Sequence, residues 1–222
     1  MTATLTPRID ARQLATYLVT DREQCQRAGR SVAQTVSDAV CGGATCVQLR
    51  MKDATDSEFL REIESVYMAI GRRVPLIIND RVDVFEQALA TGLHVAGVHV
   101  GLHDADPIEL RDRLGPTAII GVSAREKQTI ERLQHAADYF GIGPVHDTST
   151  KHDAPPGIGF DRLAELTAHS RIPVVAIGGL AAGDTSPIKR AGAAGMAIVS
   201  AICAASNPFL AARELQTAWS TP

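Results

Sequence analysis

The cationic residues Arg50, Lys52 and Lys151 each follow a short apolar run and are well suited to bind a polyanion. Arg50 and Lys52 are two residues apart, so in an extended segment both side chains point to the same side. The guanidinium fork of arginine matches a phosphate edge, and lysine adds a compact charge. Uncharged hydrogen bonds could come from Gln48, Asn79 and Ser123. The alternative is that these cations pair with carboxylates such as Asp53 or are simply solvated.

Two carboxylates, Asp80 and Asp104, also follow successive apolar runs. A pair of carboxylates facing a polyphosphate is typical of a Mg²⁺ site, in which water fills the remaining positions. The alternatives are that they cap the helices that follow, or that Asp80 pairs with Arg81 or Arg50. We interpret Asp80 and Asp104 as metal ligands because they share their surroundings with the cationic residues.

A second anion site is predicted near the end of the chain, where Gly178-Gly179 and Val199-Ser200 each follow an apolar run. Glycine has no Cβ, so its backbone N–H groups can approach an oxyanion closely. Loops of this kind often form a monophosphate site in barrel enzymes. A glycine pair after a strand is also a common plain turn, so this motif is weak on its own.

The elements that must position these residues are eight short apolar runs, most of them rich in β-branched residues. They cover residues 17–20, 45–50, 76–80, 97–101, 118–122, 139–143, 173–177 and 196–199. Segments with helical periodicity, such as 58–66, 130–136 and 161–166, lie between them. Nearly continuous apolar strands that alternate with helices indicate a parallel sheet buried on both faces.

We therefore predict an α/β fold, a (βα)8 TIM barrel, as a single domain over residues 1–222, with 1–15 and 207–222 as flanking terminal segments. Such a barrel brings the carboxyl ends of all its strands, and so the residues above, to one mouth. An open doubly wound sheet is the alternative. It is disfavoured because Thr20-Asp21-Arg22 stands where that fold has a glycine-rich turn.

Composition narrows the classes of protein further. Hydrophobic residues make up 45% and charged residues 21%, which excludes a disordered chain, a collagen and a coiled coil. The net charge of −3 provides no overall positive field, so we expect neither nucleic acid nor a membrane surface as a partner. The most apolar stretch, 191–205, is too short and too rich in alanine and glycine to span a membrane.

The cysteines and histidines carry less information. The four cysteines form no CxxC pair, and we expect a cytoplasmic protein. The spacing of His94, His99 and His103 could suggest a metal site. We prefer a structural interpretation, because His99 lies inside an apolar run and the other two flank it.

Taken together and in order, these segments resemble the thiamine phosphate synthase family from about Tyr17 to Ile202. The resemblance rests on Gln48-x-Arg50-x-Lys52, Asn79-Asp80, Gly121-Val122-Ser123, Thr148-x-Thr150-Lys151, Gly178-Gly179 and Val199-Ser200. It implies an enzyme that joins an aminomethylpyrimidine diphosphate to a thiazole phosphate, forms thiamine phosphate and releases pyrophosphate. Its partners would be these small molecules, and a homo-oligomer is left open.

The resemblance also implies a role for each matching residue. The pyrimidine diphosphate would be held by Gln48, Arg50, Lys52, Asn79, Ser123 and Lys151. The thiazole phosphate would be held by Thr148, Thr150, Gly179, Val199 and Ser200, and the matching segments add Leu49, Met51 and Ser149 to the substrate-binding set. Asp80 and Asp104 would bind Mg²⁺, and we expect Arg50, Ser123 and Lys151 to be catalytic.

The chemistry that this arrangement suits is dissociative: the diphosphate leaves, and the thiazole nitrogen captures a resonance-stabilised cation. The alternatives are a thiazole tautomerase with a similar barrel and a non-catalytic binder of the same phosphates. The cations and carboxylates argue against a tautomerase, which has no use for a diphosphate site. We also expect an insertion between Asp80 and Asp104 that includes Phe85-Glu86-Gln87, and Asp106 is the alternative to Asp104.

Overall fold

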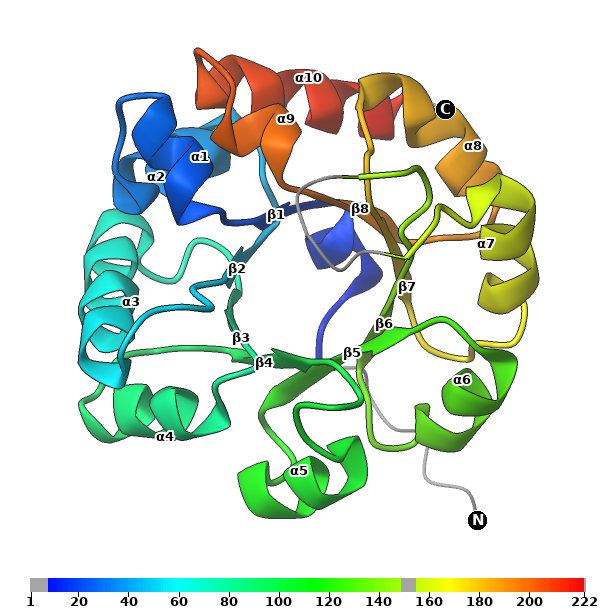
Figure 1. The fold of residues 1–222 in the computed structure, drawn as a ribbon, viewed down its shortest axis with the longest axis horizontal. Helices are drawn as coiled ribbons and strands as arrows, with labels where there is room; N and C mark the ends of the chain where they lie inside the picture. Colours follow the sequence, from blue (N-terminus) through cyan, green and yellow to red (C-terminus); the bar gives the residue numbers. More distant parts are fainter. Residues whose placement is uncertain (1–7, 149–154, 222) are drawn as a thin grey trace.

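In the computed structural model, which describes residues 8–148 and 155–221, eight parallel strands close into a barrel in chain order (Figure 1). The strands are β1 (Thr16–Val19), β2 (Cys46–Leu49), β3 (Leu76–Asn79), β4 (Gly97–Val100), β5 (Ile119–Ala124), β6 (Tyr139–Ile142), β7 (Val174–Ile177) and β8 (Gly195–Ile198). β8 pairs with β1, which closes the sheet and removes its edges. The predicted (βα)8 barrel is confirmed.

Helices surround the barrel on its outside (Figure 1). They are α1 (Arg22–Arg27), α2 (Val32–Gly42), α3 (Asp56–Ile70), α4 (Val82–Ala90), α5 (Pro107–Leu114), α6 (Lys127–Leu133), α7 (Gly159–Thr167), α8 (Thr185–Arg190), α9 (Ser200–Cys203) and α10 (Pro208–Ser220). Local signals set several starts: Ser31 with Gln34 and Thr55 with Glu58 form capping boxes before α2 and α3. No helix in the described part of the chain meets the length and hydropathy needed to cross a bilayer.

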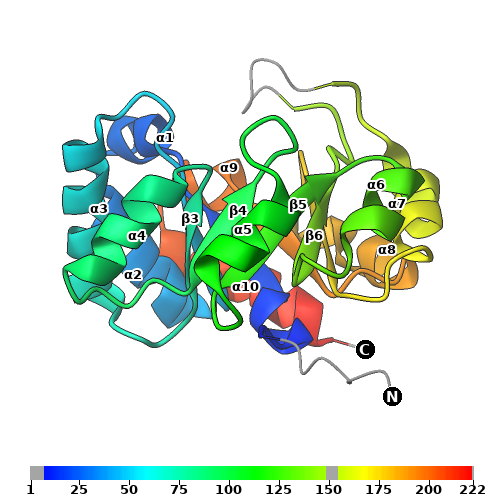
Figure 2. The same ribbon diagram turned by 90° about the horizontal axis from the view of Figure 1, so that it is seen from below.

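Two layers of apolar packing hold the barrel. The larger layer lies between strands and helices, and a smaller one fills the barrel interior around Tyr17, Ile77 and Tyr139. Ile9 and Leu14 belong to the interior cluster, so the short 3-10 helix η1 (Ala11–Leu14) closes the floor of the barrel. Figure 2 shows η1 and the end of α10 at this floor, with α1 and α9 at the opposite end.

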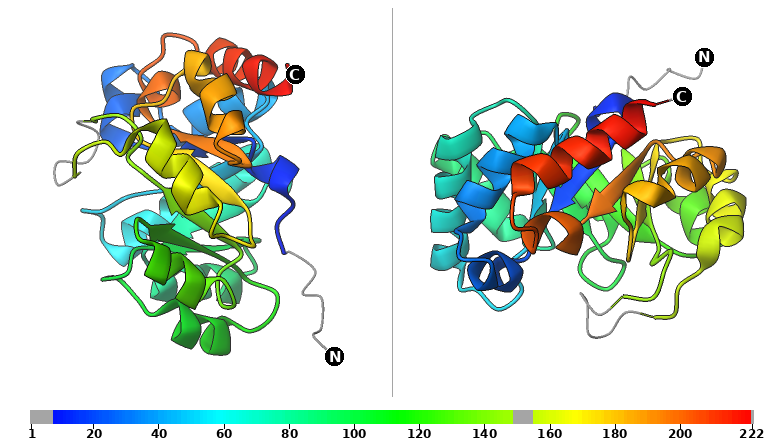
Figure 3. Two further views of the ribbon diagram at one scale, coloured as in Figure 1. Left: turned by 90° about the vertical axis from the view of Figure 1, so that its right-hand side faces the viewer. Right: turned by 90° about the horizontal axis from the view of Figure 1, so that it is seen from above.

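The C-terminal segment completes the ring of helices. α10 packs between α2 and α8 (Figures 1 and 3). The contact with α2 is close: a Cβ on Gly42 would lie 2.3 Å from the carbonyl oxygen of Phe209. Gly42 therefore allows α10 to approach α2 at a distance that a larger residue would prevent.

The segment predicted as an insertion between Asp80 and Asp104 contains a helix of the barrel. Phe85-Glu86-Gln87 lies inside α4, a regular helix of nine residues that follows β3. Val82, Val84, Phe85 and Ala88 are buried on its inner face, which is the packing expected of a barrel helix.

A buried ion-pair network fixes the N-terminal segment to the barrel. The carboxylate of Asp138 is only 3% exposed and pairs with Arg8 at 2.9 Å and with Arg111 at 2.6 Å. It also accepts a hydrogen bond from the backbone N–H of Ile120 at 2.8 Å. Two cations and a backbone donor thus compensate one buried charge. Removal of the carboxylate would leave both guanidinium groups without their anionic partner.

Candidate active site

Arg50 and Lys52, two of the three predicted cations, lie just beyond the end of β2, at the carboxyl-terminal mouth of the barrel. Arg50 is half-buried and Lys52 is exposed, and they alternate with buried Leu49 and Met51. This alternation agrees with the predicted orientation of Arg50 and Lys52 to one side. Leu49 and Met51 pack in the layer between strands and helices, so their main chains, not their side chains, are placed to reach a ligand at the mouth.

The electrostatic partners of these cations were left open by the sequence. Among residues 8–148 and 155–221, neither Arg50 nor Lys52 forms an ion pair, so the pairing with Asp53 is not observed. The backbone N–H of Arg50 donates to the hydroxyl of Thr20 at 3.1 Å, which ties the loop after β2 to the end of β1. Both positive charges are thus available to a ligand at the mouth.

The two predicted metal ligands lie close together across the ends of β3 and β4. Asp80 adopts a left-handed backbone conformation with φ of 61°, which is uncommon outside glycine and frequent at functional sites. Asn79 Nδ2 donates to Asp80 Oδ2 at 2.6 Å. Burial raises the pKa of Asp80 to about 6, and the negative charge of nearby Asp104 acts in the same direction.

The alternatives to this carboxylate pair are resolved by the loop after β4. Asp104 Oδ2 accepts a hydrogen bond from the backbone N–H of Gly101 at 3.0 Å, which holds it beside Asp80. Asp106 instead caps α5, where it accepts from the backbone N–H of Ile108 at 2.8 Å. Arg81 forms an ion pair with Asp56 and not with Asp80. Asp104, rather than Asp106, is therefore the carboxylate that faces Asp80.

Ser123 lies on β5, exposed at the mouth, and its contacts include residues that the sequence analysis did not assign to the site. Its hydroxyl is 3.0 Å from Nε2 of His99, whose Nδ1 is 3.0 Å from the hydroxyl of Tyr139. Burial lowers the pKa of His99 to about 4, so the imidazole is neutral at neutral pH. The structural interpretation of His99 was incomplete, because this buried histidine contacts a predicted catalytic group.

Glycines inside two strands are a sequence signal for His99 and Tyr139, which the sequence analysis did not assign to the site. Gly121 and Gly141 lie inside β5 and β6, where glycine weakens a strand unless another group needs the space. A Cβ on Gly121 would lie 2.2 Å from Cζ of Tyr139, and one on Gly141 would lie 3.1 Å from Cε1 of His99. Glycines at these positions therefore indicate large polar side chains in the barrel interior.

The predicted monophosphate site lies at the ends of β7 and β8, which are neighbours in the barrel. Gly178 and Gly179 have φ of 102° and 68°, values that other residues adopt at a cost. Val199 precedes α9 and Ser200, its first residue, is exposed. Thr148 follows β6 and is half-buried, whereas Ser149, Thr150 and Lys151 lie outside the described residues.

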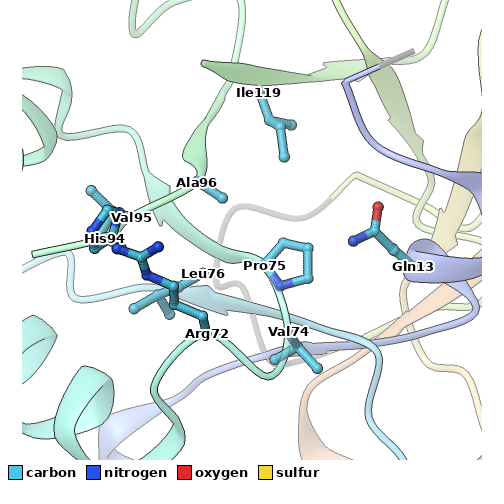
Figure 4. Close-up of a pocket in the computed structure, with 9 residues that line it drawn as sticks. All are labelled: Gln13, Arg72, Val74, Pro75, Leu76, His94, Val95, Ala96 and Ile119. Atoms are coloured by element: carbon cyan, nitrogen blue, oxygen red, sulfur yellow. The ribbon is translucent and has the colours of Figure 1, made fainter. Parts of the chain in front are cut away.

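A hollow of about 330 Å³ lies at the opposite end of the barrel (Figure 4). It is lined by residues before β3 and β4, including Arg72, Pro75 and His94, and by Gln13 of η1. This is the amino-terminal face, where barrels carry stability rather than catalysis. None of the predicted site residues that the structure describes lines this hollow.

The closed parallel barrel and its polar mouth define a TIM-barrel enzyme. Residues 16–202 match the family model described as thiamine monophosphate synthase. The thiamine-phosphate synthase of Azorhizobium caulinodans is 43% identical, over 92% of this chain and 94% of that protein. That of Xanthobacter autotrophicus is 44% identical, over 92% and 95%. The solved thiamine phosphate pyrophosphorylase of Pyrococcus furiosus superposes with a TM-score of 0.80 at 30% identity, over 94% and 96% of the two chains.

The chain therefore belongs to the thiamine monophosphate synthase family, and it is a transferase of that type.

Proposed function

We propose that this protein joins an aminomethylpyrimidine diphosphate to a thiazole phosphate and releases pyrophosphate. The observation that carries the proposal is the carboxylate pair of Asp80 and Asp104 beside the cation of Arg50 at one mouth. Negative charge accumulates on a diphosphate leaving group as its bond to carbon breaks, and Arg50 together with a divalent cation held by the two carboxylates would compensate it. A thiazole tautomerase moves only a proton and would make no use of this arrangement.

The reaction needs charge stabilisation and positioning more than a general base. The methylene carbon–oxygen bond of the pyrimidine substrate breaks, the diphosphate keeps the electron pair, and the thiazole nitrogen then bonds to that carbon. In this proposal Arg50, Lys52 and Lys151 neutralise the departing diphosphate, and Ser123 donates a hydrogen bond to it. Gln48 and Asn79 orient the pyrimidine substrate. Fixing the two substrates against each other supplies further acceleration.

Asp80 and Asp104 fit a magnesium ion, in our proposal, by the chemistry of their donor atoms. The pKa of Asp80 is raised by burial and by the neighbouring charge of Asp104, so a divalent cation between the two carboxylates would relieve this repulsion. Mg²⁺ is usually held by one or two carboxylates together with substrate phosphates. Substrate oxygens and water would fill the remaining positions around the ion. When bound, the ion would neutralise charge on the diphosphate.

The thiazole phosphate is assigned to the other side of the mouth. Gly179, Val199 and Ser200 offer backbone and hydroxyl donors at the ends of β7 and β8, and Thr148, Ser149 and Thr150 would complete the site from the loop after β6. Backbone N–H groups in such loops suit a phosphate. We further propose that the enzyme acts on these small molecules in the cytoplasm, without a nucleic-acid partner.

The test is pyrophosphate release by the purified protein with both substrates, measured with Mg²⁺ and with excess EDTA. We expect turnover that requires both substrates and stops with EDTA. If no pyrophosphate is released with both substrates present, at any concentration of either, and with saturating Mg²⁺, the proposed function is refuted. Pyrophosphate release that EDTA does not affect would refute the metal role.

The role of Ser123 is tested by Ser123→Ala. Loss of a donor to the leaving group is expected to lower kcat about 100-fold with little change in KM for the thiazole phosphate. Ser65→Ala, on the exposed face of α3, is the matched control and should keep the parent kcat. Unchanged kcat in Ser123→Ala, or a loss confined to KM for thiazole phosphate, would contradict the assignment.

A further inference from the structure

Five side chains from five strands form a continuous hydrogen-bonded chain through the barrel interior. Gln48 Nε2 donates to the Tyr17 hydroxyl at 2.9 Å, and the hydroxyls of Tyr17 and Tyr139 are 2.7 Å apart. The Tyr139 hydroxyl is 3.0 Å from His99 Nδ1, and His99 Nε2 is 3.0 Å from Ser123 Oγ. The chain thus connects two predicted substrate-binding residues, Gln48 and Ser123, that lie on different walls of the mouth.

This chain is built into the core. Tyr17 and Tyr139 are 1% and 0% exposed and belong to the interior apolar cluster. Tyrosine hydroxyls in such surroundings need partners, because an unpaired polar group in a low dielectric costs about 1–3 kcal/mol. Their direct contribution to the proposed chemistry is nil, since neither reaches the exposed mouth. Their hydroxyls instead contact buried Gln48 and His99, and His99 in turn contacts Ser123, which is exposed at the mouth.

The donor and the acceptor of each hydrogen bond in this chain can be assigned in one direction, from Gln48 to Ser123. The amide nitrogen of Gln48 can only donate, so the Tyr17 oxygen accepts and the Tyr17 hydrogen is available to Tyr139. The hydrogen of Tyr139 is then available to Nδ1 of His99. A neutral imidazole that accepts at Nδ1 carries its hydrogen on Nε2, which donates to Ser123.

If the hydrogen bonds ran in the opposite direction, Ser123 would have a different chemical role. If Tyr139 accepted from Nδ1–H, then Nε2 would accept the hydrogen of Ser123, and the serine could no longer donate at the mouth. The hydrogen of Tyr17 would also have to leave the chain, toward the neighbouring thiol of Cys46. The opposite order would also require the Tyr17 oxygen to accept two hydrogen bonds, from Gln48 and from Tyr139, so the donation by Gln48 favours the first order.

We propose that Tyr139, supported by Tyr17, is a positioning residue that holds His99 in the tautomer protonated on Nε2, so that Ser123 keeps its own hydrogen for an oxygen of the ligand. This inference rests on the proposed role of Ser123 as a donor to the diphosphate. It adds a reason for that role: the interior of the barrel, and not the loops, decides that Ser123 is a donor. Tyr139 acts through His99 and does not touch the substrates.

The tautomer can be read without any activity measurement. In protein labelled with ¹⁵N-histidine, long-range ¹H–¹⁵N correlation distinguishes a protonated from an unprotonated ring nitrogen, and His99→Gln identifies the signal among the seven histidines. We expect His99 protonated on Nε2 and not on Nδ1. Protonation on Nδ1 in the parent protein would overturn the proposal, whatever the variants do.

Tyr139→Phe removes the donor to Nδ1 and keeps the ring volume. We expect the Nδ1 tautomer to become populated and kcat for pyrophosphate release to fall about tenfold, with KM for both substrates within about twofold. Tyr17→Phe should leave the tautomer unchanged and raise KM for the pyrimidine diphosphate about threefold, because Gln48 loses its acceptor. Tyr67→Phe, a partly buried tyrosine on α3, is the control and should change neither quantity.

The outcomes separate this inference from the proposed function. A parent protein that releases no pyrophosphate removes the proposed function, while the tautomer is still read by NMR. An active parent whose Tyr139→Phe variant keeps the parent kcat and the parent tautomer overturns the inference alone. If Tyr139→Phe does not fold, the spectrum of the parent protein decides.

Discussion

Gly121→Ala tests whether space inside the barrel is reserved for the hydrogen-bonded chain. Gly121 lies opposite His99 on β4 and Tyr139 on β6 in the strand register. An added methyl group would lie 2.2 Å from Cζ and 2.3 Å from the hydroxyl of Tyr139, and 2.5 Å from Nδ1 of His99. Tyr139 cannot simply retreat, because the ring of Tyr17 packs against it edge-on with centroids 5.8 Å apart.

The expected cost follows from these contacts. Overpacking a core costs about 1–3 kcal/mol, and separating Tyr139 from His99 adds about 1 kcal/mol for the lost hydrogen bond. We therefore expect Gly121→Ala to lower the free energy of unfolding by about 2–4 kcal/mol. Displacement of His99 should also lower kcat more than tenfold, because Ser123 loses its hydrogen-bond partner.

The assay is urea unfolding followed by circular dichroism, together with pyrophosphate release, for a graded set of variants. Gly141→Ala places its methyl 3.1 Å from His99 and should be intermediate, and Gly183→Ala, with no atom within 4 Å and ordinary backbone angles, should match the parent. The reasoning is refuted if Gly121→Ala unfolds within about 0.5 kcal/mol of the parent. It is equally refuted if Gly141→Ala is the more damaging change.

Three further predictions concern other parts of the molecule. Asp104→Asn should raise the Mg²⁺ concentration for half-maximal activity at least about tenfold, whereas Asp106→Asn, which keeps a good helix cap, should not; the reverse result would move the metal site. Asp138→Ala should lower the free energy of unfolding by about 3–5 kcal/mol, measured in urea, and a loss under about 1 kcal/mol would show that Arg8 and Arg111 do not depend on it. Native alkylation followed by mass spectrometry should modify Cys41 alone, because the other three cysteines are buried; labelling of a second cysteine before unfolding would contradict this burial.

Local patterns in the sequence were sufficient for the barrel but not for every connection. The alternation of apolar runs and helical segments predicts eight strands because each must bury both faces. For the segment after Asp80 we predict an insertion and no specific structure, and the structure places α4 there. Its apolar residues Val82, Phe85 and Ala88 have helical spacing, so the sequence does contain a signal for α4.

The choice between Asp104 and Asp106 required the loop conformation. Both residues are carboxylates within reach of the same strand end, and their identity alone does not separate them. Asp106 precedes Pro107 at the start of α5, where a helix cap is favourable, and Asp104 folds back onto Gly101 beside Asp80. Backbone hydrogen bonds thus decided which carboxylate faces the mouth.

The fold class, the residues at the ends of the strands and the family could be predicted before the structure, because these depend on residue type and short-range order. The sequence could not determine the interior hydrogen-bonded chain. Tyr17 and Tyr139 are 122 positions apart, and their hydroxyls meet at 2.7 Å only after the barrel closes and fixes which side chains point inward. Strand register and closure are properties of the whole sheet, so no local pattern specifies which two tyrosines will share a hydrogen bond.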